Sequence, residues 1–369
     1  MSYEVGTRIG DYQVVERLGA GGMGAVYKVR NLITDRLEAM KVLLPDLREA
    51  GDLAERFSRE IKVHASLVHP NIAALHTALL VEHQLCMIME FVEGVSLAER
   101  LRQGPMQVLE SVAYTSQVLS ALSYAHERGV IHRDIKPANI MVTPERIVKL
   151  MDFGIATTTS TGKLQNRLTA TGMALGSLHY MSPEQVKAGA PDARSDLYSL
   201  GITLYEMVTG QCPIRGNSEY EIMAAHLAIS PPSPAELNPF LPPALSAIIL
   251  KAMAKRPDDR FQTAAEFRAN LESLVAGATP SAPRTAISGE SRLDLTARGA
   301  TPPAGTATLS PSVLEATAKD LAVYIGPMAK ILVNRAAKHA ANPRQLYEAV
   351  AAEIASPADR ARFLAKRGT

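Results

Sequence analysis

The sequence has little of several features that mark other protein classes. It contains only two cysteines, Cys86 and Cys212, which cannot build a disulfide scaffold and which fit a reducing compartment. The net charge is only +2, from 39 basic and 37 acidic residues, which removes the usual basis for nucleic-acid binding. No apolar run approaches the about 18 residues of a membrane span, and the first residues lack the pattern of a signal peptide. We therefore expect a cytoplasmic protein with no membrane span and no nucleic-acid partner.

The 369 residues exceed one ordinary domain and fall into three zones of different composition. Residues 1–275 alternate strand-like and helix-like segments and carry a net charge of −3. In residues 276–310, 26 of the 35 residues are Ala, Gly, Ser, Thr or Pro, which is typical of a disordered, flexible linker. Residues 311–369 regain apolar periodicity and carry a net charge of +4. These zones predict a large first domain, a linker and a small all-α domain.

Apolar periodicity predicts two lobes in the first domain. Runs rich in Val, Ile and Leu favour strands at Arg8–Leu18, Ala25–Asn31, Leu37–Leu43, Leu75–Val81 and Leu85–Phe91. Helical spacing of apolar residues favours helices at Asp46–Leu67, Met106–Arg128, Arg194–Thr209 and Leu245–Lys255. A small strand-rich lobe followed by a larger helical lobe is therefore expected. In the small domain, prolines that suit a first helical turn divide the periodic pattern into four helices, at Pro327, Pro343 and Pro357.

A glycine-rich segment lies between the first two predicted strands. Four glycines fall within residues 19–24, and a strand follows them, which argues against a dinucleotide-binding turn because that turn opens a helix. A strand–glycine–strand hairpin can fold its backbone N–H groups over phosphates, since glycine lets the backbone approach closely. Lys41, on a later strand, could bind phosphate oxygens if a carboxylate such as Glu60 held it in place. By itself, the glycine segment is equally compatible with a flexible hairpin.

Two further segments carry groups that suit phosphoryl transfer. In the segment His132–Asn139, Asp134 can accept a hydroxyl proton and Lys136 can neutralise a phosphoryl group. Asn139 can supply a hard oxygen ligand to Mg²⁺. Asp152 begins an Asp-Phe-Gly sequence after another short strand-like run, and its carboxylate can chelate the same kind of ion.

Taken together and in this order, these segments resemble the bacterial eukaryotic-like (Hanks-type) serine/threonine protein kinases. The resemblance covers residues 12–271. It also includes the segments His69–Ile72, Ser182–Glu184 and Asp192–Gly201, together with Arg260, which would pair with Glu184. It implies an α+β, bilobal protein-kinase fold with an antiparallel N-lobe sheet, an αC helix and a mostly helical C-lobe. The implied activity is transfer of the ATP γ-phosphoryl group to Ser and Thr hydroxyls of protein substrates in signal transduction.

The resemblance also implies a role for each matching residue. The catalytic residues would be Asp134 as base, Lys136, and Lys41 held by Glu60. Asn139 and Asp152 would hold Mg²⁺, with Mn²⁺ as an alternative ion. The residues that bind ATP would be Leu18, Gly19, Ala20, Gly21, Gly22, Met23, Gly24, Ala25, Val26, Ala39, Lys41, Glu90, Val92 and Met141.

Three positions stand out against the family pattern. Ser177 replaces the usual threonine of the activation segment but keeps its hydroxyl. Ala138 replaces a glutamate that reads arginine in some kinases, so a strong preference for that arginine is not expected. His64 stands at a usually apolar position behind Phe153. We interpret it as a neutral core histidine, with a pH-sensitive group as the alternative.

The predicted activation segment contains two candidate phosphorylation sites, Thr169 and Thr171. Arg133 precedes the catalytic aspartate and would place a buried cation beside this segment. An unpaired buried guanidinium is costly and favours an anion, which phosphate would supply. We therefore expect activation-loop autophosphorylation in trans. The alternative is that both threonines are solvated loop residues.

Two other functions compete with a protein kinase. A pseudokinase scaffold would bind partners without chemistry, but Lys41, Asp134, Asn139 and Asp152 are all present. A phosphotransferase for small molecules is disfavoured by the long segment 155–181 with its hydroxyl groups. The small helical domain shows neither a metal cluster nor a nucleotide motif. For it, docking or dimerisation is favoured over specific ligand binding.

Overall fold

The structure is a computed structural model of the chain. It describes residues 3–21, 24–43, 61–81, 84–153, 175–276, 310–325, 329–337, 340, 342–351, 354 and 357–365. The chain divides into two compact units, Met1–Glu272 and Ser273–Thr369. Some sequence-based predictions lie outside the described residues: those for the linker and for Gly22, Met23, Glu60, Thr169 and Thr171. Within the described ranges, no helix is long and apolar enough to cross a membrane.

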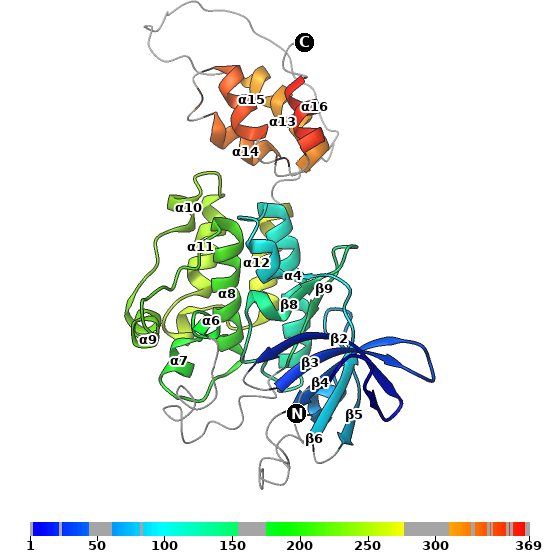
Figure 1. The fold of residues 1–369 in the computed structure, drawn as a ribbon. Coiled ribbons are helices and arrows are strands. Elements are labelled where there is room, and N and C mark those ends of the chain that lie inside the picture. The colour runs from blue at the N-terminus through cyan, green and yellow to red at the C-terminus, as the bar shows by residue number, and fades with distance from the viewer. Residues whose placement is uncertain are drawn as a thin grey trace, which may run out of the picture. The chain divides into compact units, whose positions relative to one another are not determined.

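The first unit begins with a six-stranded antiparallel sheet (Figure 1). Its strands, in the order β1-β2-β3-β4-β6-β5, are β1 (Arg8–Ile9), β2 (Tyr12–Gly21), β3 (Gly24–Asn31), β4 (Leu37–Leu43), β6 (Gln84–Glu90) and β5 (Leu75–Val81). The predicted strand Arg8–Leu18 starts correctly but is not continuous, because Gly10 adopts a φ of 59° and a turn separates β1 from β2. Of the helix predicted at Asp46–Leu67, residues 61–65 are helical, and residues 44–60 lie outside the described ranges.

Side chains along each strand alternate between the two faces of the sheet. One face packs into the core, and the other carries residues that were predicted to bind ATP. The core cluster of the first face consists of Ile9, Tyr12, Val14, Tyr27, Val29, Met40, Val42, Cys86 and Ile88. Met40 and Val42 of β4 belong to this cluster, so Ala39 and Lys41 point to the opposite face. The strand register pairs Lys41 with Val26 of β3. The predicted phosphate-binding lysine therefore lies on the strand next to the glycine hairpin.

The rest of the first unit is mostly helical, as predicted (Figure 1). Its helices are α3 (Leu97–Leu101), α4 (Val108–His126), η1 (Pro137–Asn139), α6 (Leu175–Leu178), α7 (Pro183–Val186), α8 (Ala193–Thr209), α9 (Glu219–Ala228), α10 (Pro234–Leu237), α11 (Pro243–Ala252), η3 (Pro257–Asp259) and α12 (Ala264–Ala276). Helix α8 is buried along most of its length and packs against α4 and α11. A Cβ on Gly201 of α8 would lie 2.9 Å from the Cβ of Ala252, so only glycine permits this approach to α11. Helix α11 starts two residues before its predicted start, because Pro243 suits a first helical turn.

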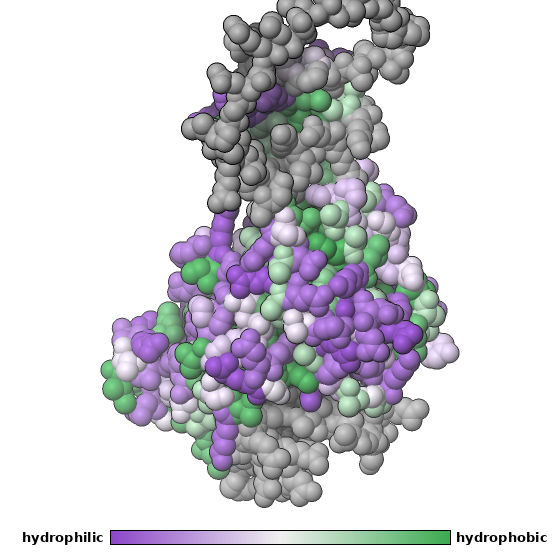
Figure 2. All heavy atoms as spheres, turned by 180° about the vertical axis from the view of Figure 1, so that it is seen from behind, coloured by the Kyte–Doolittle hydropathy of each residue, from purple (hydrophilic) through white to green (hydrophobic). Residues whose placement is uncertain are grey.

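A second, three-stranded sheet joins the two lobes. It consists of β7 (Val95–Ser96), β8 (Ile140–Val142) and β9 (Val148–Leu150). The amide of Leu150 donates to the carbonyl of Asn71 over 2.9 Å, and the amide of Ala73 donates back to Leu150 over 3.0 Å. These bonds tie the segment before β5 to β9, which leads directly to Asp152. Hydrophilic side chains predominate over the helical part of this unit in Figure 2, so most of its apolar side chains lie in the core.

The described part of the second unit contains four helices, as predicted: α13 (Pro311–Ile325), α14 (Ala329–Ala336), α15 (Pro343–Ala351) and α16 (Pro357–Ala365). Its core includes Leu321, Leu332, Val333, Leu346, Val350 and Phe363. The Tyr347 ring stacks on Phe363 at 5.1 Å, and its hydroxyl donates to Asp320 over 3.1 Å. The buried Phe363 ring and the partly buried Tyr347 ring thus give this small unit a defined aromatic contact in its core.

Candidate active site

The nucleotide side of the candidate site is built from β2, β3 and β4. Gly21 pairs with Gly24 across the hairpin, and Gly24 has a φ of 138°, which favours glycine. On β4, the buried Ala39 pairs with Met89 of β6, which is also buried. The other described residues that were predicted to bind ATP lie on β2 and β3, at or just after the end of β6, and on β8, namely Leu18, Ala25, Val26, Glu90, Val92 and Met141.

The side chain of Glu90 has a role that the sequence did not reveal. The sequence predicted Glu90 only as a residue that binds ATP. Its carboxylate accepts a hydrogen bond from the Ala74 amide over 3.1 Å and forms an ion pair of 2.7 Å with Lys149 of β9. The end of β6 is thereby anchored to both the segment before β5 and to β9.

One buried carboxylate fixes the backbone at the start of the catalytic loop, residues 132–139. Asp196 of α8 is 1% exposed and accepts hydrogen bonds from the amides of His132, over 2.9 Å, and Arg133, over 2.7 Å. His126 bonds to the same carboxylate over 2.7 Å. Arg133 has a φ of 66°, a conformation that costs free energy for a residue with a side chain. The bonds to Asp196 hold this strained turn in place.

Asp134 lies at the centre of a compact polar cluster. Its Oδ2 accepts a hydrogen bond from Lys136 Nζ over 2.7 Å and from Asn139 Nδ2 over 2.9 Å. Lys136 Nζ also donates to Ser177 Oγ over 2.7 Å, so the lysine joins the activation segment to the candidate base. About one-third of the Asp134 side chain is exposed, which leaves it accessible to a substrate hydroxyl.

Asp152 lies two residues after β9 and forms an ion pair of 2.7 Å with Lys41. Burial alone would raise the pKa of Asp152, but the Lys41 ammonium more than offsets burial and holds that pKa below its usual range. Asp152 is therefore ionised at neutral pH. The predicted partner of Lys41, Glu60, lies outside the described residues, so the Lys41–Glu60 pair stays a prediction.

Two histidines pack against Phe153, the residue after Asp152. The His132 ring lies 4.6 Å from the Phe153 ring, and the His64 ring lies 5.8 Å from it. Burial lowers the pKa of His64 to about 4, so this side chain is neutral at pH 7. The interpretation of His64 as a neutral core histidine is confirmed.

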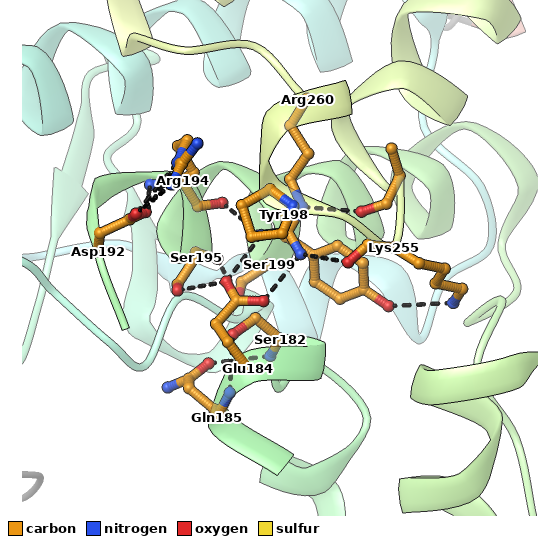
Figure 3. Close-up of polar contacts among 12 residues, drawn as sticks. Ser182, Glu184, Gln185, Asp192, Arg194, Ser195, Tyr198, Ser199, Lys255 and Arg260 are labelled. Atoms are coloured by element: carbon orange, nitrogen blue, oxygen red, sulfur yellow. Dashed lines mark hydrogen bonds and ion pairs between the residues drawn. The ribbon is translucent and has the colours of Figure 1, made fainter. Parts of the chain in front are cut away.

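A buried ion pair anchors the C-terminal end of the activation segment (Figure 3). The guanidinium of Arg260 donates to both carboxylate oxygens of Glu184, over 2.7 and 2.8 Å, as predicted from the sequence. Ser195 donates to the same carboxylate over 2.5 Å. Burial alone would raise the pKa of Glu184, but Arg260 and Ser195 together lower it to about 2. The pair therefore stays charged at all physiological pH values.

Gln185, next to Glu184, connects this anchor to the catalytic loop. Its Oε1 accepts a hydrogen bond from the Ser182 amide over 2.9 Å, and its Nε2 donates to the Arg133 carbonyl over 2.8 Å. The Ser-x-x-Gln spacing is the sequence signal of a capping box and could have predicted the first bond. The second bond joins residues 52 positions apart, and no local pattern signals it.

Arg133 has an unsatisfied nitrogen beside this connection. Its Nε is buried and, among the described residues, has no hydrogen-bond partner. A buried guanidinium nitrogen without an acceptor carries a desolvation cost. An anionic group would remove this cost.

Comparisons with known proteins agree with this geometry. The model of the protein kinase domain family matches residues 12–269, and the model of a domain of unknown function, DUF8082, matches residues 312–367. The chain is 39% identical to the serine/threonine-protein kinase PrkC of Bacillus subtilis over 271 residues, which are 73% of this chain and 41% of PrkC. It is 40% identical to the serine/threonine-protein kinase PknB of Mycolicibacterium smegmatis over 285 residues, which are 76% of this chain and 45% of PknB.

Solved structures show the same likeness. A crystal structure of the Mycobacterium tuberculosis PknI kinase domain aligns with a TM-score of 0.60 and 30% identity, and the alignment covers 75% of this chain and all of that one. The chain spans less than half the length of the curated relatives PrkC and PknB. The bilobal fold, the buried Glu184–Arg260 pair and the family match all agree. The chain belongs to the protein kinase family, among its bacterial Hanks-type serine/threonine members.

Proposed function

We propose that the chain transfers the γ-phosphoryl group of ATP to Ser and Thr hydroxyls of protein substrates, in signal transduction. The observation that supports this most is the cluster in which Asp134 contacts Lys136 and Asn139. A carboxylate in this position can accept the proton of a substrate hydroxyl. The adjacent ammonium of Lys136 can stabilise the negative charge that develops on the transferring group. Catalysis then depends mainly on positioning and charge neutralisation.

Asn139 and Asp152 fit a divalent cation, Mg²⁺ or alternatively Mn²⁺. Asn139 donates through Nδ2 to Asp134, which leaves its amide oxygen as the ligand atom. Asp152 is ionised, and carboxylate and amide oxygens are ligands that Mg²⁺ prefers. The described residues contain no cluster of three metal-ligating His, Cys, Asp or Glu side chains, so nucleotide phosphates would complete the coordination. A bound cation would neutralise phosphate charge, and Lys41 would hold phosphate oxygens.

The direct test is phosphate transfer by the full chain. Labelled ATP, Mg²⁺ and a panel of proteins should give labelled phosphoserine or phosphothreonine, and a panel of small metabolites should give no labelled product. Transfer to metabolites alone would favour the small-molecule phosphotransferase. ATP binding without any transfer would favour the pseudokinase scaffold.

We expect autophosphorylation in trans at Thr169 and Thr171, both outside the described residues. The buried Nε of Arg133, which lacks an acceptor among the described residues, motivates this prediction. A phosphate adds close to two negative charges and three acceptor oxygens. One new charge-assisted hydrogen bond to Arg133 would raise the rate by roughly tenfold or more. Phosphosite mapping of the wild type should find phosphate on Thr169 and Thr171. The initial rate of Thr169→Ala/Thr171→Ala should be lower than that of the wild type by the same factor.

Thr157→Ala/Thr158→Ala is the matched control, because it removes two hydroxyls from the same segment. This control should keep the wild-type rate. Arg133→Ala should make the rate independent of the phosphate on the segment. Equal rates for wild type and Thr169→Ala/Thr171→Ala, before and after phosphatase treatment, would contradict phosphate-driven activation.

For the second unit, we propose an interaction module that dimerises the chain or docks it to a protein partner. The unit combines its own apolar core with a net charge of +4 over residues 311–369. If it dimerises the chain, sedimentation of the full chain should show self-association that is lost when the chain ends at residue 275. A monomeric full chain at high concentration would exclude dimerisation and leave docking as the form to test.

A further inference from the structure

Three side chains of the helical lobe form a continuous line of hydrogen bonds that ends at the activation segment. Lys255, after α11, places its Nζ 3.4 Å from the Tyr198 hydroxyl of α8, a contact drawn in Figure 3. That hydroxyl lies 3.1 Å from Nδ1 of His226 on α9. Nε2 of His226 lies 2.8 Å from the carbonyl oxygen of Leu178. We call this line the His226 relay.

The partners determine the direction of each bond in the His226 relay. Burial lowers the pKa of His226 to about 4, so the ring is neutral and carries one proton. The Leu178 carbonyl can only accept, so that proton is on Nε2. Nδ1 is then an acceptor and takes the hydrogen of the Tyr198 hydroxyl. The Tyr198 oxygen in turn accepts from Lys255, and every bond has one donor and one acceptor.

The relay ends one residue away from the catalytic cluster. Leu178 follows Ser177, whose hydroxyl accepts the 2.7 Å hydrogen bond from Lys136. Ser199 of α8 holds the same segment at the Tyr180 carbonyl over 2.6 Å. The backbone on the C-terminal side of Ser177 is therefore attached at two points, to the buried His226 of α9 and to the buried Ser199 of α8. A shift of the Leu178 carbonyl moves the Ser177 hydroxyl relative to Lys136 and Asp134.

Lys41, Ala39 and Asp152 on the nucleotide side of the site have no such attachment. Lys41 and Ala39 belong to β4 of the other lobe, and Asp152 lies at the end of β9. None of these residues contacts the His226 relay through a bond described above. Loss of the relay therefore acts first on Ser177, Lys136 and Asp134, which would receive the protein hydroxyl, and leaves Lys41, Ala39 and Asp152 in place.

We propose that His226 is a positioning residue for the protein-substrate side of the site, acting through the Leu178 carbonyl on Ser177 and Lys136. This inference rests on the proposed kinase function and deepens it. The relay touches the Glu184–Arg260 anchor, because the Arg260 guanidinium lies 4.8 Å from the centre of the Tyr198 ring and donates to the Lys255 carbonyl over 3.1 Å. It differs from the anchor in what it holds: its last bond goes to the segment before Glu184, and it uses neither carboxylate oxygen of that pair.

The test compares variants of the full chain by steady-state kinetics. His226→Leu removes both bonds and should lower kcat/KM for a protein substrate about tenfold, since it leaves a buried carbonyl unsatisfied. The KM for ATP should stay within about twofold. His226→Gln places an amide nitrogen that can donate to Leu178 and should recover most of the loss. A folded His226→Gln with no recovery would overturn the proposal.

Two tyrosines of α8 give a matched pair in case His226→Leu does not fold. Tyr198 and Tyr205 are both buried, and each makes a 3.1 Å hydrogen bond through its hydroxyl, Tyr205 to the Pro232 carbonyl. Tyr198→Phe should lower kcat/KM for the protein substrate severalfold, and Tyr205→Phe should not. Equal effects of the two on kcat/KM would show a merely structural role and overturn the proposal. A wild-type chain that phosphorylates no protein would instead contradict the proposed function itself.

Discussion

Asp134→Asn should lower the turnover of phosphoryl transfer by at least about 10²-fold, the scale of a lost general base. The amide that replaces the carboxylate cannot accept the hydroxyl proton. In the wild type, Lys136 and Asn139 both donate to Asp134 Oδ2. The amide oxygen of the asparagine can still accept these two hydrogen bonds. The loop geometry is therefore kept, and the loss reports the chemistry. Initial rates with saturating ATP and a generic protein substrate measure it.

The companion variant Asp152→Asn should weaken ATP binding as well as turnover, whereas Asp134→Asn should affect turnover alone. It removes the charge that pairs with Lys41 at 2.7 Å and that would hold the divalent cation. We expect a similar loss in turnover, of at least about 10²-fold, together with weaker Mg²⁺-dependent ATP binding. Asp134→Asn should bind ATP normally, because Asp134 has no predicted nucleotide contact.

Asp35→Asn is the control for both substitutions. Asp35 is exposed, lies in the turn between β3 and β4, and has a φ of 58°, which asparagine also tolerates. Its variant should keep the wild-type rate and ATP affinity. A purified Asp134→Asn protein that works at a rate near that of wild type would exclude the proposed base.

The elements with regular apolar spacing and the residues of the family motifs could be predicted from the sequence. The strands of the N-lobe and helix α4 follow from local periodicity, because apolar residues recur along one side of each element, whereas α8 follows from a mostly apolar run of helical length that is buried on all sides. The Glu184–Arg260 pair followed from family resemblance. The break at Gly10 was missed because a single glycine within an apolar run does not reveal its φ.

The contacts that fix the active-site geometry could not be predicted in the same way. Gln185 reaches the Arg133 carbonyl across 52 positions, and His226 reaches the Leu178 carbonyl across 48. Both acceptors are backbone oxygens, which every residue has, so no residue type marks them in the sequence. The Lys41–Asp152 pair joins residues 111 positions apart that the motifs identify separately. Only the packed structure shows that these two meet.

The second large effect concerns stability. Glu184→Gln should lower the free energy of unfolding by about 3–5 kcal/mol, the usual range for breaking a buried ion pair by removing one partner. The reason is the partner that remains: the Arg260 side chain is 0% exposed and would keep its charge without a carboxylate. Chemical denaturation at pH 7 measures the difference from wild type.

Glu272→Gln is the matched control for this substitution. Glu272 also pairs with an arginine, Arg268, at 2.7 Å, but its side chain is 53% exposed and the pair lies on the surface of α12. Surface pairs at this helical spacing contribute about 0.3–0.5 kcal/mol. The two variants thus remove the same charge at the same distance and differ in burial. A cost for Glu184→Gln no larger than that for Glu272→Gln would show that the buried pair does not stabilise the fold.

The pH dependence gives an independent check on the same pair. The pKa of Glu184 is lowered to about 2 in the folded chain, from an ordinary value of 4.5. A carboxyl group with a lowered pKa binds fewer protons when folded, so its stabilisation is fully present above pH 4.5 and declines as the pH falls towards 2. The stability gap between wild type and Glu184→Gln should therefore be constant from pH 7 to about pH 5.5 and should narrow below about pH 4.5. A gap that stays constant down to pH 3 would mean that the carboxylate charge of Glu184 does not stabilise the folded state.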